Sequence, residues 1–186
     1  MSNGTDTLFV LTGGPGAGKT TLIEALADAG HATCPEAGRG IIRDQMTVDG
    51  AALPWKDPAL FAEMMLSWEL RSHHAAAGRE RPVFLDRGVP DVIGYLLLCG
   101  LPVPAHMWTA AERFRYNPTV FVAPPWRAIY RQDGERRQTW DEAVRTRDLM
   151  VETWHGLGYR TIALPCAPVE ERLRFVLGET GLEHRS

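Results

Sequence analysis

Short runs of apolar residues alternate along the chain with longer segments in which apolar residues recur every three or four positions. The short runs are typical of β-strands and the longer segments of amphipathic helices. Strands are expected at residues 8–12, 31–34, 82–86, 119–123 and 160–164. Strands that alternate with helices predict an α/β fold, with a five-stranded parallel sheet and helices on both faces.

The helices are predicted from the same spacing and from glycine and proline positions. The first, over 19–29, carries Leu22, Ile23, Leu26 and Ala29 on one face and ends at Gly30. Further helices are expected over 38–46, 59–77, 90–98, 104–115, 138–156 and 169–177. Residues 48–58 contain glycine and two prolines, which predicts a loop.

Length and composition suit one domain over residues 1–186, with its core at 8–177 and a loose tail from Glu179. A net charge of −3 gives no electrostatic case for nucleic acid or an anionic membrane. The first residues lack the pattern of a signal peptide, and no apolar run is long enough to span a membrane. We therefore expect a cytoplasmic protein with no nucleic-acid or membrane partner. The oligomeric state is left open.

A glycine-rich turn follows the first predicted strand and leads into the first predicted helix. It reads Gly13, Gly14, Pro15, Gly16, Ala17, Gly18, Lys19 and Thr20, which matches GxxxxGK[ST] at every fixed position. Glycines let the main chain wrap closely around phosphate groups, so that backbone N–H groups converge on them. The helix that follows adds the positive end of its dipole. A plain glycine-rich turn is the alternative.

This phosphate loop assigns roles to individual side chains. Lys19 is expected to reach the β- and γ-phosphates, and the hydroxyl of Thr20 to bind Mg²⁺. We expect the residues from Gly13 to Thr20, together with Thr21, to bind the nucleotide. ATP and GTP are both open, although no NKxD guanine signature is present.

A second carboxylate is expected beside the phosphate loop. Asp86 ends the third predicted strand, where P-loop proteins need an acidic residue for Mg²⁺ or its water. Because ligands gather at the carboxyl ends of parallel strands, Asp86 is expected in the same crevice. Capping of the next helix is the alternative, but Pro90 as first helical residue favours Val89 as the cap. Arg87 is a candidate phosphate or substrate ligand.

Glu36 follows the second predicted strand and also reaches the carboxyl edge. A carboxylate at this position can accept the proton of an attacking alcohol in a kinase. The alternative is a glutamate that only complements the dipole of the next helix.

An arginine-rich loop, about 124–137, follows the fourth strand. Phosphoryl transfer builds negative charge, which a closing cationic lid stabilises, and Arg131 and Arg136 are the best candidates there. A solvated charged loop is the alternative. Trp55 and Trp126 are candidate pocket residues, although core packing is the commoner role of tryptophan.

The chain resembles the AAA-type P-loop ATPase group that includes the ribosylnicotinamide kinase domain. The resemblance covers about residues 8–177 and is carried by Phe9–Thr20, Pro35–Arg39, Asp86–Gly88 with Pro90, Asp91 and Tyr95, Pro124–Trp126, and Asp133–Gln138. It implies a kinase-like sheet in which the Asp86 strand neighbours the strand before the phosphate loop. It also implies an arginine-bearing lid after the fourth strand, with Lys19 and Thr20 serving phosphate and Mg²⁺, and Asp86 the metal or base role. Ribosylnicotinamide kinases usually have Asp where this chain has Pro124.

Three functions are compatible with these residues. The first is a Mg²⁺-dependent, ATP-binding kinase of a small hydroxyl-bearing molecule. Its catalytic residues would be Lys19, Glu36, Asp86, Arg87, Arg131 and Arg136, with Asp86 as the alternative base to Glu36. A regulatory ATPase or nucleotide-dependent switch is the second, and a nucleotide-binding module without turnover is the third. The sequence does not name the acceptor, whose pocket we expect to be shaped by Val48–Trp55 and the helices near Met64 and Tyr95.

Overall fold

The computed structural model describes residues 5–129 and 139–182. Its strands are β1 (Leu8–Gly13), β2 (Ala32–Cys34), β3 (Val83–Asp86), β4 (Thr119–Ala123) and β5 (Arg160–Ala163). Its helices are α1 (Lys19–Asp28), α2 (Ala37–Thr47), α3 (Pro58–Ala76), α4 (Val89–Leu98), α5 (Ala105–Arg113), α6 (Trp140–Gly156) and α7 (Val169–Glu179).

The five strands form one parallel sheet in the order β2-β3-β1-β4-β5. The predicted α/β class and parallel sheet are therefore confirmed. Strand β3 lies beside β1, with Leu11 in register with Asp86. On the other side of β1, Gly13 is in register with Ala123 of β4. The loop after β1 and the carboxylate of Asp86 therefore come from the same edge of the sheet.

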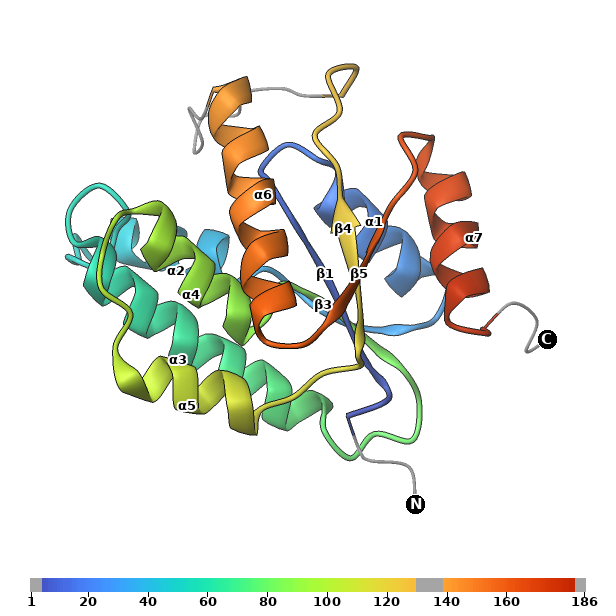
Figure 1. Ribbon diagram of the computed structural model, residues 1–186, viewed down its shortest axis with the longest axis horizontal. Helices are drawn as coiled ribbons and strands as arrows, with labels where there is room; N and C mark the ends of the chain where they lie inside the picture. The colour runs from blue at the N-terminus through green and yellow to red at the C-terminus, as the bar shows by residue number, and fades with distance from the viewer. Residues whose placement is uncertain (1–4, 130–138, 183–186) are drawn as a thin grey trace.

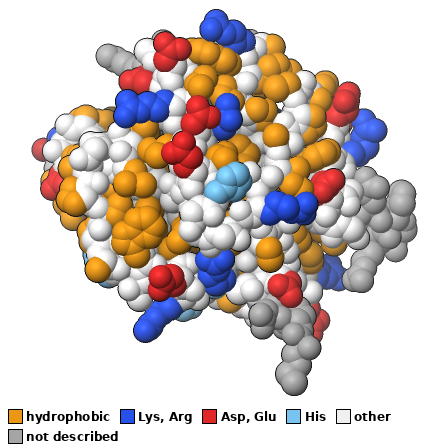
Figure 2. Space-filling view, in the orientation of Figure 1, with side chains coloured by type: hydrophobic (Ala, Val, Ile, Leu, Met, Phe, Trp, Pro, Cys, Tyr) orange, Lys and Arg blue, Asp and Glu red, His pale blue; other side chains and the backbone are white. Residues whose placement is uncertain are grey.

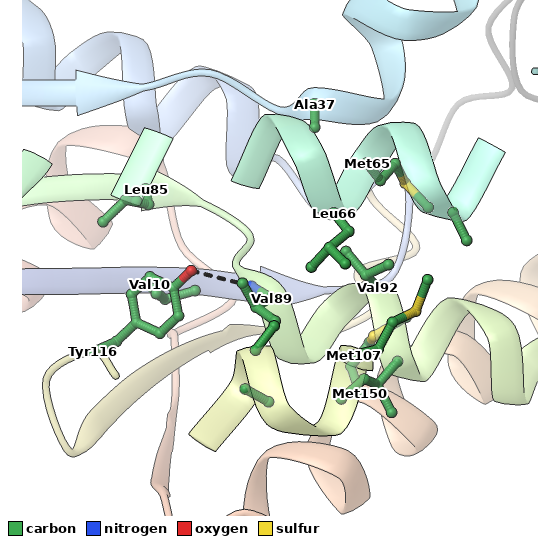
Figure 3. Close-up of a cluster of buried hydrophobic side chains, with 14 of the residues drawn as sticks. Val10, Ala37, Met65, Leu66, Leu85, Val89, Val92, Met107, Tyr116 and Met150 are labelled. Carbon is green, nitrogen blue, oxygen red and sulfur yellow. Dashed lines mark hydrogen bonds between the residues drawn. The ribbon is translucent and has the colours of Figure 1, made fainter. Parts of the chain in front are cut away.

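Helices cover both faces of this sheet (Figure 1). Alternate residues of β1 divide between two cores, as the pleat of a strand requires. Leu8 and Val10 pack with residues of α2 to α6, part of which Figure 3 shows. Phe9 and Leu11 pack on the opposite face with α1 and α7. The sheet is thus buried on both sides, which explains the continuous apolar run in β1.

The boundaries of three helices, α4, α7 and α1, differ from those predicted from the sequence. Helix α4 begins at Val89, with Gly88 as its N-cap, so the prediction of Val89 as the cap is wrong. The backbone N–H of Val89 donates instead to the hydroxyl of Tyr116, at 3.1 Å (Figure 3). Helix α7 continues to Glu179, where a loose tail was expected. Ala29 is exposed beyond the end of α1, so it does not extend the buried face of that helix.

Acidic and basic side chains are interspersed with hydrophobic ones on the surface shown in Figure 2. Such a mixture produces no strong field of one sign on that face. In the described part of the chain, none of the helices combines the length and hydrophobicity that crossing a bilayer requires.

Candidate active site

The phosphate loop connects the end of β1 to the start of α1 and packs tightly against neighbouring backbone. Gly13 has a φ of +128°, and a Cβ there would lie 2.4 Å from the carbonyl oxygen of Ala123. A Cβ on Gly14 would lie 2.4 Å from the carbonyl oxygen of Ala143 in α6. Both positions need glycine for lack of space, and Gly13 also for its backbone conformation. The sequence motif is thus folded as a close loop between β4 and α6.

Lys19 lies under this loop as the first residue of α1 and is only 5% exposed. Its ammonium group donates to the carbonyl oxygen of Gly14 at 2.9 Å and, more weakly, to that of Gly13 at 3.5 Å. These bonds hold the cation across the inside of the loop.

A cavity of about 560 Å³ opens over the loop, and we call it the phosphate cavity. Its lining includes Gly16 to Thr21, Glu36, Arg39, Trp126, Ile129, and Ala167 to Val169 with Arg172. Thr20 and Thr21 have exposed side chains at this surface. Trp126 was expected either in a pocket or in the core, and it lines this cavity while half-buried.

Arg172 joins α7 to the phosphate loop. Its Nη1 donates to the carbonyl oxygen of Ala17 at 3.1 Å and lies 3.5 Å from that of Gly18. The residue is only 3% exposed, and burial lowers the pKa of its guanidinium. A buried cation that binds loop carbonyls stabilises the conformation of the loop.

Asp86 is buried at the end of β3 and does not line the phosphate cavity. Burial raises its pKa from 3.8 to about 6, an effect that the nearby charge of Lys19 opposes. The Oδ1 atom of Asp86 is buried without a hydrogen-bond partner among the described residues. At the start of α4 the hydrogen bond comes from Asp91 instead: its Oδ2 accepts from the N–H of Gly88, the N-cap residue, at 3.2 Å. The capping alternative for Asp86 is therefore wrong.

Arg87 follows Asp86 and has a φ of +78°, a backbone conformation that non-glycine residues rarely adopt. Its guanidinium donates to Glu36 Oε1, to Asp91 Oδ1 and to the carbonyl oxygen of Gly13, each at 3.2 Å. These contacts tie the strained residue to β1, to the N-cap residue of α2 and to α4. Strain that is held by several partners in this way is typical of functional sites.

Asp91 is the hub of the buried polar network. Its carboxylate accepts from the hydroxyl of Thr12 and from Arg87, and its Oδ2 accepts from the indole N–H of Trp154 at 3.1 Å. Burial raises the pKa of Asp91, and Arg87 and Thr12 act against that rise. The network connects β1, α4 and α6 beneath the phosphate loop.

Glu36 precedes α2 as its N-cap, but its side chain makes no capping hydrogen bond. Its carboxylate instead pairs with Arg87 at 3.2 Å and with Arg39 at 3.6 Å. Simple complementation of the helix dipole therefore does not describe its contacts. Two guanidinium groups fix the orientation of the carboxylate.

A second cavity, about 260 Å³, lies between α2, α3, α4 and α6, and we call it the helix-lined cavity. Its apolar walls include Trp55, Phe61, Met65, Tyr95 and Met150, and its polar lining includes Glu36, Glu69, Arg87, Asp91 and Thr146. Trp55 is 58% exposed, so the core-packing alternative for this residue is wrong. The lining includes Met65 and Tyr95, from the two helices that were expected to shape the acceptor pocket.

Glu36 is the acidic residue that lines both cavities. The fold brings Glu36, Lys19, Asp86 and Arg87 together at the carboxyl edge of the sheet, but Asp86 does not line the crevice over the phosphate loop, where it was expected. Arg87 faces the helix-lined cavity and is not part of the lining of the phosphate cavity.

The predicted lid residues Arg131 and Arg136 lie outside the described residues, as does most of the 124–137 loop. Arg127, at the start of that loop, is exposed, and its guanidinium lies 4.6 Å from the centre of the Trp140 ring. This contact fastens the described start of the loop to α6.

Sequence reasoning missed the parts played by Glu69 and Arg172. The sequence does point to both residues, because each is a charged residue on the apolar face of its helix. Glu69 follows Phe61 and Met65 at intervals of four residues, and Arg172 precedes Val176 by four. A charged residue on such a face is either paired or functional.

The donors around the phosphate loop fit a magnesium nucleotide. The loop leaves no room for a Cβ at Gly13 or Gly14, and the buried Oδ1 of Asp86 has no described partner. Within residues 5–129 and 139–182, no group of three or more His, Cys, Asp or Glu side chains could hold a metal ion. Mg²⁺ in P-loop sites takes few protein ligands, because phosphate and water oxygens supply the others. Thr20, which lines the phosphate cavity, and Asp86, whose pKa burial raises and the nearby charge of Lys19 lowers, are the candidate protein ligands for such a site.

Comparison with protein-family models identifies an AAA domain over residues 8–172, which is most of the chain. The chain belongs to this AAA domain family. A comparison with curated proteins found no match.

Solved structures with the fold of this AAA domain include small-molecule kinases. The NadR protein in complex with NR superposes with a TM-score of 0.67 at 19% identity, covering 98% of this chain and 54% of the other. Thymidylate kinase from Ehrlichia chaffeensis gives 0.61 at 13% identity, covering 95% and 98%. Shikimate kinase from Acinetobacter baumannii in complex with shikimate gives 0.57 at 14% identity, covering 97% of each chain. The AAA domain thus has a kinase-like P-loop NTPase fold and spans about half of the NadR chain.

Proposed function

We propose that this AAA domain is a Mg²⁺-dependent kinase that transfers the γ-phosphoryl group of ATP to a hydroxyl of a small molecule. The nucleotide would occupy the phosphate cavity, and the acceptor the helix-lined cavity. The observation that carries the proposal is Glu36, whose carboxylate lines both cavities. A hydrolase needs only a water next to the γ-phosphate, whereas a kinase needs a second pocket that adjoins the first.

The phosphate loop would bind the nucleotide through backbone N–H groups and the ammonium of Lys19. Lys19 already lies inside the loop, so an incoming triphosphate replaces its contacts with Gly13 and Gly14 rather than requiring a large movement. Thr20 and Asp86 would hold Mg²⁺, which neutralises charge on the β- and γ-phosphates when it is bound.

Glu36 would act as the general base. The acceptor oxygen attacks the γ-phosphorus while its proton passes to the carboxylate of Glu36, and ADP leaves with the β–γ bridging oxygen. Arg87 and Arg39 hold that carboxylate in place. Orientation by two cations reduces the freedom that the base must lose at the transition state. Arg131 and Arg136 remain candidate lid residues for the transferring phosphoryl group.

The test is transfer of label from [γ-³²P]ATP in the presence of Mg²⁺ to a panel of small hydroxyl compounds. A kinase places label on an organic acceptor. Release of labelled inorganic phosphate alone, at a rate that no panel member changes, would support the regulatory ATPase instead. Lys19→Ala provides the background rate for both reactions. The same panel with GTP as donor decides the nucleotide preference.

A further inference from the structure

The polar groups of the helix-lined cavity are mostly acidic. Glu36, Glu69 and Asp91 line it, and Arg87 is the basic residue among the described lining residues. A pocket with this balance attracts cations and neutral hydrogen-bonding groups and repels anions.

The charge of Arg87 is already paired with groups of the protein itself. Its guanidinium bonds to Glu36, to Asp91 and to the carbonyl oxygen of Gly13. A carboxylate or phosphate on the acceptor would have to displace one of these buried partners, leaving a charged group unpaired. The described part of the cavity therefore offers no cation ready for an anionic acceptor.

Glu69 lies in the wall of this cavity on α3. It is only 4% exposed, and its carboxyl group forms no hydrogen bond with another described residue. Burial and the neighbouring carboxylates of Asp91 and Asp86 raise the pKa of Glu69 well above its ordinary value. A buried carboxylic acid that faces a cavity can donate one hydrogen bond and accept others. Buried polar groups in proteins nearly always have such partners.

We infer that the acceptor is a hydroxyl compound without an anionic group, and that Glu69 hydrogen-bonds to it at the wall of the helix-lined cavity. This inference rests on the proposed kinase function. The apolar walls, among them Phe61, Met65 and Met150, contact the body of the acceptor. Glu36 receives its reacting hydroxyl, and Glu69 binds a second polar group, so the two carboxyl groups together orient the molecule.

The experiment uses matched pairs of acceptors with [γ-³²P]ATP and Mg²⁺. Each nucleoside, polyol or amino alcohol without an anionic group is assayed beside its own monophosphate or carboxylate. Label is expected on the uncharged or cationic member, with kcat/KM at least about tenfold above that of the anionic member. Equal or faster labelling of anionic members overturns the inference while leaving the kinase function intact. Absence of label on every compound, with phosphate release only, instead contradicts the proposed function.

Three variants test Glu69 with the acceptor that the wild-type protein labels best. Glu69→Leu removes the hydrogen bond and is expected to raise the acceptor KM at least about tenfold, with the ATP KM unchanged. Glu69→Gln keeps both donor and acceptor atoms and is expected to stay within about threefold of wild type. Glu63→Gln, on the exposed side of α3 where it contacts His106, is the control and should match wild type.

Two outcomes would contradict the part assigned to Glu69. An unchanged acceptor KM in Glu69→Leu means that the side chain does not touch the acceptor. An acceptor KM that rises as much in Glu69→Gln as in Glu69→Leu means that the carboxyl group binds the acceptor as an anion. Circular dichroism and thermal unfolding of each variant separate these results from failure to fold.

Discussion

The two cavities of this AAA domain are built from different parts of the chain. The phosphate cavity includes one contiguous run, Gly16 to Thr21, which contributes backbone groups and Lys19, and residues of α2, α7 and the loop after β4 complete it. The helix-lined cavity takes side chains from α2, α3, α4 and α6 and from the loop that carries Trp55. Backbone donors suit any triphosphate, whereas side chains from separate helices distinguish one small molecule from another.

The two cavities also differ in the charge of their lining residues. Lys19, Arg39 and Arg172 line the phosphate cavity, and the helix-lined cavity is mainly acidic. Glu36 stands at the junction, held by arginines from both sides. The contrast implies that changes on the phosphate side should alter catalysis or ATP binding, while changes on the other side should alter recognition of the acceptor.

Replacing Lys19 should produce the largest effect on activity. Lys19→Ala is expected to lower kcat/KM by about 10²–10³-fold, because it removes the cation that stabilises charge on the phosphates. Lys56→Ala is the matched control, since Lys56 is the other lysine of the chain and pairs with Asp49 on the surface. Turnover is measured with [γ-³²P]ATP, and folding by circular dichroism. Wild-type turnover in Lys19→Ala would contradict the assignment of the phosphate cavity.

Removing the charge of Glu36 tests the junction between the cavities. Glu36→Gln is expected to lower kcat by about 100-fold while leaving ATP affinity unchanged, because the amide cannot accept the acceptor proton. Glu24→Gln, on the exposed side of α1, serves as the control. Single-turnover transfer and calorimetry with ATP and Mg²⁺ measure the two quantities. Weaker ATP binding with normal transfer would exclude Glu36 as the base.

The same contrast explains what the sequence could predict. Strand alternation and the GxxxxGK[ST] spacing are local, so they predicted a parallel sheet, the succession of strands and helices along the chain and the loop from Gly13 to Thr20. The adjacency of β1 and β3 came from the family resemblance. Glu69 and Arg172 were missed because their roles depend on helices far apart in sequence. The Val89 cap was misjudged because Pro90 can also occupy the second helical position.

The ionisation of Asp86 predicts a pH dependence with a defined sign. Its folded-state pKa of about 6 exceeds the ordinary value of 3.8, so the folded chain holds this proton to higher pH than the unfolded chain does. The stability that the proton contributes is present below about pH 4 and is lost as pH rises to about 6. Asp86→Asn should therefore exceed wild type in unfolding free energy at pH 7.5 by about 2–3 kcal/mol, and by much less at pH 4.

Urea denaturation without nucleotide at pH 4 and pH 7.5 measures this difference. Asp28→Asn, at the exposed end of α1, provides the control. A stability difference that does not change with pH, or a less stable Asp86→Asn at pH 7.5, would contradict the buried, protonated carboxyl. Activity should follow the opposite trend, because Mg²⁺ requires the ionised form: kcat/KM should rise with pH, with a midpoint near pH 6, and level off about one pH unit higher.

Arg172 tests whether α7 supports the phosphate loop. Arg172→Met keeps much of the apolar stem but removes the hydrogen bonds to Ala17 and Gly18, and it is expected to weaken ATP binding about tenfold. Arg172→Lys should recover part of the loss, because it restores a cation. The control is Arg174→Met, an exposed arginine on the same helix. Equal ATP affinity in Arg172→Met and wild type, measured by calorimetry, would show that the loop holds its shape without α7.

The smallest effect is expected at the mouth of the helix-lined cavity. Trp55 covers part of the cavity wall while remaining 58% exposed, so its removal takes away contact area without leaving a hole in the core. Trp55→Ala should raise the acceptor KM about threefold to tenfold, with the ATP KM and the unfolding free energy close to wild type. Trp108→Ala removes a partly exposed tryptophan on α5, outside both cavities, and should change neither constant. If Trp55→Ala instead raised the ATP KM and left the acceptor KM unchanged, the division of the two substrates between the two cavities would be wrong.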